Sequence, residues 1–265
     1  MNAPRSALVT GAARGIGAAT VAALCAQGYR VLALDSCAGT QRPPGVVGAL
    51  ATSDDLDAVV AAHPDQVLAV VADVRDQQAL ERAAARAVEE FGALDAVVAA
   101  AGVIGGGRPL WQTPAEDLTA QWEVNARGVW NTAAATVPHL LANPDPSRAR
   151  FVAIASAAGQ RGMFGLAAYA ASKHAVIGIV RGLAADLVGT GVTAVAVAPG
   201  ATDTAMLRAT AELYGLPDTE ELSAHQLLRR AIDPAEQAAV IALCCSPEGA
   251  ALNGSVVSAD GGFVG

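Results

Sequence analysis

Seven short aliphatic runs alternate with helical patterns along the whole 265-residue chain, and this order restricts the folds that it can adopt. The runs show little polar alternation, which is typical of strands that are buried on both faces of a parallel sheet. They cover residues 6–10, 30–35, 67–72, 94–99, 150–155, 192–198 and 255–258. The helical patterns cover residues 15–27, 53–62, 77–91, 114–142, 168–189 and 234–245. The sequence therefore predicts a single doubly wound α/β domain over residues 1–265, of the Rossmann type, with a parallel seven-stranded sheet and helices on both faces.

Two dipeptides indicate where helices start. Thr113–Pro114 and Asp233–Pro234 each place a capping side chain directly before a proline, whose fixed φ suits the first helical turn. We therefore expect Thr113 and Asp233 to be N-caps, with the prolines at the first helical positions.

Composition excludes several classes of partner. The chain carries 25 acidic and 17 basic residues, a net charge of −8, and its arginines are scattered, so it has no basic patch for nucleic acid. Its longest apolar stretches are short and broken by glycine, which argues against a membrane span, and residues 1–5 do not resemble a signal peptide. The four cysteines show no metal-binding or disulfide spacing. We therefore expect a cytoplasmic protein without a metal site.

A glycine-rich loop follows the first predicted strand. Gly11, Gly15 and Gly17 allow a tight turn, a close approach to a pyrophosphate and a helix N-terminus that faces the anion. Asp35 stands at the end of the next strand, where a carboxylate accepts hydrogen bonds from the adenosine ribose and repels a 2′-phosphate. The two residues after Asp35 are uncharged. The pattern predicts NAD as the cofactor.

The chain contains a single lysine, Lys173, which stands four residues after Tyr169. This spacing places both side chains on one face of a helix. An ammonium beside a phenol stabilises the phenolate and lowers a pKa that is ~10 in water. Tyr169 is therefore expected to act as a general acid and base, and the broad guanidinium of an arginine would not replace the compact ammonium.

These residues belong to a larger set of motifs. The sequence contains, in this order, TGAARGIG (10–17), Asp35, Asp73–Val74, Asn125 in WEVNARGVW, Ser156 in IASAAG, Tyr169 and Lys173 in YAASK, and PGATDT (199–204). The set resembles the short-chain dehydrogenase/reductase family over essentially the whole chain. The resemblance implies a Rossmann-type sheet, a nicotinamide cofactor and hydride transfer between an alcohol and a ketone.

The resemblance also implies roles for individual residues. Tyr169 would be the acid/base, and Lys173 would lower its pKa and bind the nicotinamide ribose. Ser156 would hold the substrate oxygen, and Asn125 would belong to a proton relay. The residues expected to bind the cofactor are Gly11, Arg14, Gly15, Ile16, Gly17, Asp35, Asp73, Val74, Ala101, Gly102, Tyr169, Lys173, Pro199, Gly200, Thr202 and Thr204. Those expected to bind the substrate are Ser156, Ala157, Met163, Phe164, Tyr169 and Met206.

One stretch departs from the family pattern. Residues 99–102 read AAAG, where the family usually has an NNAG-like sequence. Gly102 keeps the backbone close to the cofactor, but the usual polar anchors of this loop are missing. We expect a small effect on stability and retained activity.

Two connections are longer than is usual in compact α/β units. Residues 36–50 follow the predicted ribose acid, and their apolar Val46, Val47 and Leu50 are expected to close over the adenosine half of the cofactor. This stretch resembles the insertion of the mycofactocin-associated, carveol-dehydrogenase-like subfamily, in which a tightly held cofactor is reoxidised by another redox carrier. An ordinary surface loop is the alternative. Residues 199–232 are expected to form a substrate loop.

The sequence thus predicts an NAD-dependent oxidoreductase that interconverts a small or medium-sized, mostly apolar secondary alcohol and its ketone. One alternative is a biosynthetic ketoreductase that uses free NAD(H), and another is a dinucleotide-binding regulator without catalysis. Ser156, Tyr169 and Lys173 argue against the regulator, because a protein that only binds needs no proton-transfer group. Members of the family that the chain resembles usually form tetramers, and the Ala-rich helical stretches 114–142 and 168–189 offer a smooth packing surface. We therefore also expect a homotetramer.

Overall fold

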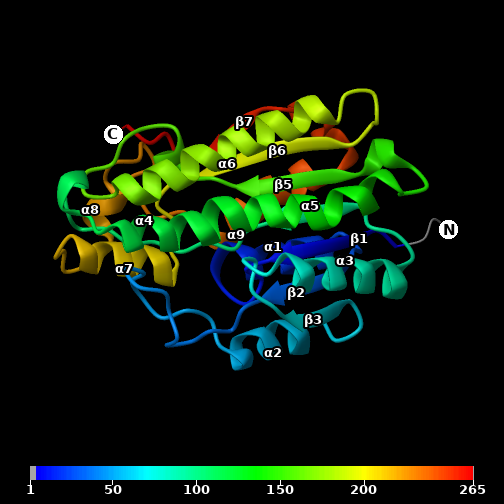
Figure 1. The fold of residues 1–265 in the computed structure, drawn as a ribbon, viewed down its shortest axis with the longest axis horizontal. Coiled ribbons are helices and arrows are strands. Elements are labelled where there is room, and N and C mark those ends of the chain that lie inside the picture. The colour runs from blue at the N-terminus through cyan, green and yellow to red at the C-terminus, as the bar shows by residue number, and fades with distance from the viewer. Residues whose placement is uncertain (1–3, 265) are drawn as a thin grey trace.

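Residues 4–264, which the computed structural model describes, contain one seven-stranded parallel sheet (Figure 1). Its strand order is β3-β2-β1-β4-β5-β6-β7. The strands are β1 (Ser6–Thr10), β2 (Arg30–Asp35), β3 (Val67–Val71), β4 (Ala96–Ala99), β5 (Arg150–Ile154), β6 (Thr193–Pro199) and β7 (Val256–Ala259). Every strand overlaps its predicted range, and the predicted fold class is confirmed.

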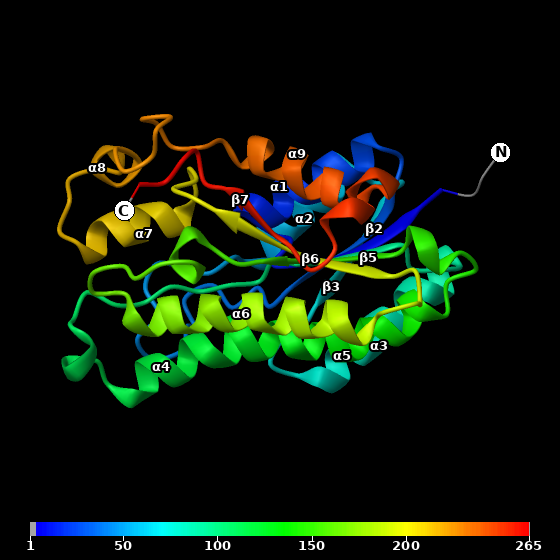
Figure 2. The ribbon, with the colours of Figure 1, turned by 90° about the horizontal axis from the view of Figure 1, so that it is seen from above.

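Helices cover both faces of the sheet (Figure 2). One face carries α3 (Gln77–Phe91), α4 (Ala115–Gln121), α5 (Gly128–Leu141) and α6 (Ala167–Asp186). The other carries α1 (Gly15–Ala26), α2 (Ser53–Ala62) and α9 (Pro234–Cys245). Beyond the carboxyl ends of the strands lie α7 (Ala205–Leu213) and α8 (Glu220–Ser223). Short 3₁₀ turns occur at Leu110–Gln112, Pro146–Arg148, Ala157–Gly159 and Pro247–Leu252. No helix within residues 4–264 combines the length and the apolar character that a bilayer crossing requires.

Side chains of each central strand alternate between two apolar cores. In β1, Leu8 packs into the core under α3, α5 and α6, whereas Ala7 and Val9 pack into the core under α1 and α9. In β5, Phe151 packs into the first of these cores and Val152 packs into the second. Because both faces are covered, the inner positions of these strands are apolar on both sides, and this explains the aliphatic runs of the sequence.

The two predicted helix starts have different outcomes. Asp233 caps α9 as expected, because its carboxylate accepts a 2.7 Å hydrogen bond from the backbone N–H of Ala235. The prediction for Thr113 is wrong: α4 starts at Ala115, and Pro114 occupies the N-cap position. The hydroxyl of Thr113 instead donates to the carbonyl oxygen of Pro109 and closes the preceding 3₁₀ turn.

The long helix predicted over residues 114–142 is divided. A π-helical turn, Trp122–Arg127, separates α4 from α5. Such turns are rare and occur frequently at functional sites. This turn contains Asn125, which is fully buried.

Candidate active site

One cleft of 790 Å³ follows the carboxyl ends of the strands, where open α/β sheets bind their ligands. Its volume lies in the range of about 300–1,000 Å³ that is typical of ligand pockets. Every residue predicted to bind the cofactor or the substrate lines it, and so do Ser156, Tyr169 and Lys173 of the predicted catalytic set. Asn125, the fourth member of that set, is buried beneath it.

The glycine loop joins β1 to α1 at the floor of the cleft. Gly11 has a φ of +65°, and a Cβ atom added to it would lie 2.6 Å from the Cα atom of Ala101. A Cβ atom on Gly17 would lie 1.9 Å from the carbonyl oxygen of Gly11. Glycine is therefore required at both positions, as the fingerprint predicts.

The N-terminus of α1 is suited to an anion. Gly15, Ile16 and Gly17, its first three residues, line the cleft. Arg14 occupies the N-cap position, and its side chain makes no capping hydrogen bond within residues 4–264, whereas Thr52 caps α2. The first N–H groups of a helix need partners, and a pyrophosphate supplies them. The loop thus fits a dinucleotide.

The charge of Arg14 is paired within the protein. Its guanidinium lies 2.6 Å from a carboxylate oxygen of Asp55 in α2. Hydrogen bonding from Arg14 is the largest cause that lowers the pKa of Asp55, to about 2. Arg14 therefore lines the cleft, as expected of a cofactor-binding residue, but its positive charge is already paired with Asp55.

Asp35 lies at the end of β2 and links two segments beside the cleft. One carboxylate oxygen accepts a hydrogen bond from the backbone N–H of Ala13 in the glycine loop, at 3.2 Å. The other accepts from the backbone N–H of Cys37, at 3.1 Å, and Cys37 has a left-handed φ of +50°. The carboxylate is thus held in place by both neighbouring segments.

The loop after β3 is also ordered by its own side chains. Both carboxylate oxygens of Asp73 contact Arg75, with a closest distance of 2.6 Å. Val74 is 5% exposed and packs against Gly128 of α5. Asp73 and Val74, both predicted to bind the cofactor, therefore line the cleft while they also shape its wall.

Thr10 replaces the polar anchors that the AAAG stretch lacks. Its hydroxyl oxygen accepts hydrogen bonds from the backbone N–H groups of Ala100 and Ala101, at 3.2 and 3.3 Å. The anchor comes from β1, which pairs with β4. Sequence reasoning missed it because Thr10 and Ala100 are far apart in the chain.

Ser156, Tyr169 and Lys173 meet at the middle of the cleft. Ser156 follows β5, and its hydroxyl oxygen accepts a hydrogen bond from the N–H of Ala158 at 3.1 Å. Tyr169 and Lys173 share one face of α6, and the Lys173 Nζ lies 5.9 Å from the centre of the Tyr169 ring. The same Nζ donates a 2.8 Å hydrogen bond to the carbonyl oxygen of Ile154.

Burial controls the ionisation of this pair. It lowers the pKa of Lys173 to about 8. It also raises the pKa of Tyr169, which the neighbouring Ser156 hydroxyl opposes. The direction for Tyr169 differs from the expectation that Lys173 lowers its pKa. The reason is that the Lys173 ammonium points to the Ile154 carbonyl, so desolvation of the phenol dominates.

Asn125 connects the π turn to the loop after β4. Its side chain exchanges hydrogen bonds with both backbone groups of Val103, at 2.8 and 2.9 Å. Its amide also donates to the hydroxyl of Ser172, at 2.9 Å, and Ser172 donates to the Tyr169 carbonyl oxygen. The π turn thus ties the residues around Tyr169 to the cleft wall.

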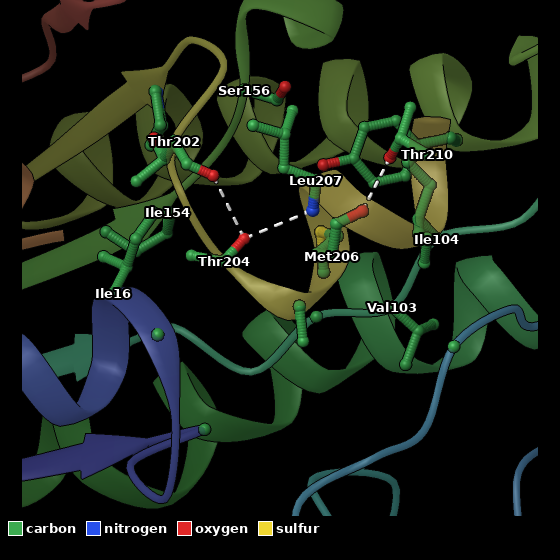
Figure 3. Close-up of a pocket in the computed structure, with 18 of the residues that line it drawn as sticks. Ile16, Val103, Ile104, Ile154, Ser156, Thr202, Thr204, Met206, Leu207 and Thr210 are labelled. Carbon is green, nitrogen blue, oxygen red and sulfur yellow. Dashed lines mark hydrogen bonds between the residues drawn. The ribbon is translucent and has the colours of Figure 1, made fainter. Parts of the chain in front are cut away.

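Thr204 positions α7 over the cleft. Its hydroxyl accepts from the backbone N–H of Leu207 at 3.3 Å and donates to the carbonyl oxygen of Thr202 at 3.2 Å (Figure 3). Thr204 is therefore the N-cap of α7. Its methyl group faces the glycine loop, since a Cβ atom on Gly15 would lie 3.1 Å from it.

Residues 36–50, here called the strap, run from β2 toward α7 and return to α2 (Figure 1). Val47 and Leu50 line the cleft, and their closure over the adenosine half of the cofactor stays a prediction. The expectation for Val46 is wrong, because its side chain is 4% exposed and packs into the core under α3 and α5. The Val47 side chain packs against the apolar cluster that includes Ile104 and Tyr169, so its position is not on the adenosine side alone.

Several lining residues were missed from the sequence. Ile104, Leu166 and Tyr214 come from three separate segments, and Phe263 comes from the C-terminal segment. The Tyr214 hydroxyl donates to the carbonyl oxygen of Phe164 and so joins the end of α7 to the loop before α6. Only Tyr214 had a signal, since it lies in the predicted substrate loop.

Comparisons with known proteins agree with this geometry. A model of the family described as Enoyl-(Acyl carrier protein) reductase matches residues 11–264. An uncharacterized NAD-dependent oxidoreductase of Mycobacterium tuberculosis is 39% identical over 214 residues, covering 77% of this chain and 73% of the relative. The 1-deoxy-11-beta-hydroxypentalenate dehydrogenase of Streptomyces avermitilis is 41% identical over 206 residues, covering 77% of this chain and 71% of the relative.

A solved structure matches almost the whole fold. The carveol dehydrogenase of Mycobacterium avium, in complex with NAD, has a TM-score of 0.88 and 28% sequence identity. The match covers 98% of this chain and 97% of that chain. The motifs, the sheet, the cleft and these matches agree, and the chain belongs to the short-chain dehydrogenase/reductase family of oxidoreductases.

Proposed function

We propose that this protein is an NAD-dependent dehydrogenase that interconverts an apolar secondary alcohol and its ketone. The observation that carries the proposal is one cleft that joins the glycine loop to Ser156, Tyr169 and Lys173. A protein that only binds a dinucleotide has no use for a buried tyrosine and lysine beside a serine hydroxyl. The apolar side chains around Tyr169 favour an apolar substrate.

The choice of NAD rests on two carboxylates. Asp35 would accept hydrogen bonds from the adenosine ribose, and its charge would repel a 2′-phosphate. Asp55 forms an ion pair with Arg14, the arginine of the glycine loop. The charge of Arg14 is therefore not free to attract a 2′-phosphate. The names of similar proteins, an NAD-dependent oxidoreductase and an NAD-bound dehydrogenase, point to the same cofactor.

The protein side of the reaction is proton transfer at Tyr169. NAD supplies the hydride acceptor, and its reduced form the hydride donor. Because burial raises the pKa of Tyr169, its hydroxyl is protonated at neutral pH and can donate to a ketone oxygen. Lys173, with a pKa of about 8, is mostly protonated at neutral pH and places a positive charge 5.9 Å from the centre of the Tyr169 ring. Ser156 would hold the reacting oxygen, and Asn125 would belong to a proton relay.

The strap is proposed to retain the cofactor. It lines the cleft beside Asp35 and packs against α7 through Gly48, whose added Cβ atom would lie 2.9 Å from Ala209. Release of a dinucleotide would require these contacts to separate. This arrangement supports membership of the mycofactocin-associated type, in which a separate redox carrier reoxidises the bound cofactor.

We further propose a homotetramer. Leu118, Trp122 and Trp130 are 43%, 44% and 62% exposed along α4, the π turn and α5. Exposed apolar groups in such a row indicate a protein interface, and identical subunits usually associate through symmetric faces.

Light scattering should therefore give about four times the 26.5 kDa chain mass, and Trp130→Glu should lower the measured mass. A monomeric mass of the unaltered protein at micromolar concentration would contradict the proposal.

Tyr169→Phe tests the catalytic assignment. Loss of the proton-transfer hydroxyl should lower kcat by about 10²–10⁴-fold, while NAD binding stays close to that of the unaltered protein. Tyr214→Phe is the matched control, because it removes a hydroxyl from another tyrosine of the same cleft and should lower kcat far less. Turnover should be measured with a panel of secondary alcohols and ketones. A fully active Tyr169→Phe enzyme would remove Tyr169 from this role.

Asp35→Asn tests whether the Asp35 carboxylate recognises the adenosine ribose and so distinguishes NAD from NADP. The amide oxygen can still accept the hydrogen bond from Ala13, so the glycine loop should remain folded, but the negative charge and the hydrogen bond from Cys37 are lost. The ratio of NAD to NADP affinity should fall by about tenfold, since a hydrogen bond to a charged group contributes about 1.5–3 kcal/mol. Equilibrium binding of both cofactors measures this ratio. An unchanged ratio would show that Asp35 does not distinguish them.

Shortening the strap tests its role in retention. The backbones of Gly39 and Leu50 are joined by a 2.9 Å hydrogen bond, so residues 40–49 can be replaced by an Asn-Gly turn. NAD should copurify with the unaltered protein and exchange slowly with labelled NAD, and the shortened protein should exchange it faster. Thr40→Ala, at an exposed strap position, is the control. Rapid exchange in the unaltered protein would favour a ketoreductase that uses free NAD(H).

A further inference from the structure

The strap extends past the dinucleotide region and reaches the tyrosine end of the cleft. The backbone N–H of Val47 donates a 3.0 Å hydrogen bond to the carbonyl oxygen of Ile104, in the loop after β4. The Val47 side chain packs against the buried cluster of Ile104, Ala158, Leu166 and Tyr169. A residue of the strap therefore packs against the cluster that contains Tyr169, the proposed acid and base.

The position of Val47 is held from both sides. Before it, the carbonyl oxygen of Gly45 lies against Gly105, where an added Cβ atom would be 2.0 Å away. After it, Gly48 lies against Ala209 of α7. Arg42 also donates to the carbonyl oxygen of Gly48 at 3.3 Å, which closes the strap on itself. These contacts hold Val47 in place in the wall of the cleft.

The surroundings of Val47 are apolar. Met163, Met206, Leu213 and Tyr214 pack with it against the same cluster. Two of these, Met163 and Met206, are predicted substrate contacts, and all but Leu213 line the cleft together with Val47. A hydrocarbon group attached to the reacting carbon would meet these side chains, and Val47 would limit its bulk from the strap side.

We propose that Val47 is a specificity-determining residue, which sets the size of the apolar group that the cleft accepts on the reacting carbon. The inference rests on the proposed alcohol dehydrogenase function. It gives the strap a second role, because one segment then both covers the dinucleotide and selects the substrate. A missing or added methylene in an apolar pocket changes discrimination by about 10- to 200-fold, so a single side chain is sufficient.

The test compares two secondary alcohols that differ in the bulk of one group on the reacting carbon, 2-butanol and 3,3-dimethyl-2-butanol. Formation of enzyme-bound reduced nicotinamide, followed by its fluorescence in a single turnover, gives a rate for each alcohol that does not depend on cofactor exchange. Val47→Ala should shift the ratio of the two rates by about tenfold toward the bulkier alcohol. Val47→Phe should shift it in the opposite direction. The affinity for NAD and the thermal midpoint should stay close to those of the unaltered protein.

Leu50→Ala is the matched control, because it removes a larger side chain from the same strap at a position outside the Tyr169 cluster. It should leave the ratio of rates unchanged. An equal shift in Leu50→Ala, or no shift in either Val47 variant, would overturn the inference while the proposed function stands. Absence of turnover by the unaltered protein with both alcohols and with a wider panel of alcohols and ketones would overturn the proposed function itself.

Discussion

The rest of the structure depends on a parallel sheet that is buried on both faces. All seven strands point in one direction, so their carboxyl ends meet at one edge, and the helices that return the chain must cover both faces. Residues that are far apart in the sequence, from Gly11 to Thr204, therefore meet in one cleft. The arrangement of the cleft follows from that geometry, because the ends of the strands, the segments that follow them and the adjoining helices supply the groups that line it.

A buried interior of this kind requires a partner for each polar group, and here the partners also shape the site. The ammonium of Lys173 is bound to the carbonyl oxygen of Ile154, at the end of β5. Asn125 uses a π turn to reach both backbone groups of Val103. Thr10 holds the loop after β4. Each bond satisfies a buried group and also fixes the position of a segment around Tyr169, so the cleft is preorganised by the same interactions that complete the fold.

The strap joins the two ends of this cleft. It is fixed to the dinucleotide end by the hydrogen bond between Cys37 and Asp35, and to the tyrosine end by the bond between Val47 and Ile104. Its contact with α7 connects it to the segment that covers the substrate side. We therefore propose one continuous segment for both the retention of the cofactor and the selection of the substrate.

The sequence by itself determined the strands, most helices, the fold class, the glycine loop and the spacing of Tyr169 and Lys173, because these are set by local periodicity and by residues close in the chain. Tertiary structure alone decided what depends on distant partners. It paired Arg14 with Asp55, and it turned Val46 into the core while its neighbour Val47 entered the cleft. It also decided the ionisation of Tyr169, since the pKa of a phenol follows its burial and the direction of the nearest ammonium. Burial and direction are properties of the packed chain, and no local pattern of residues specifies them.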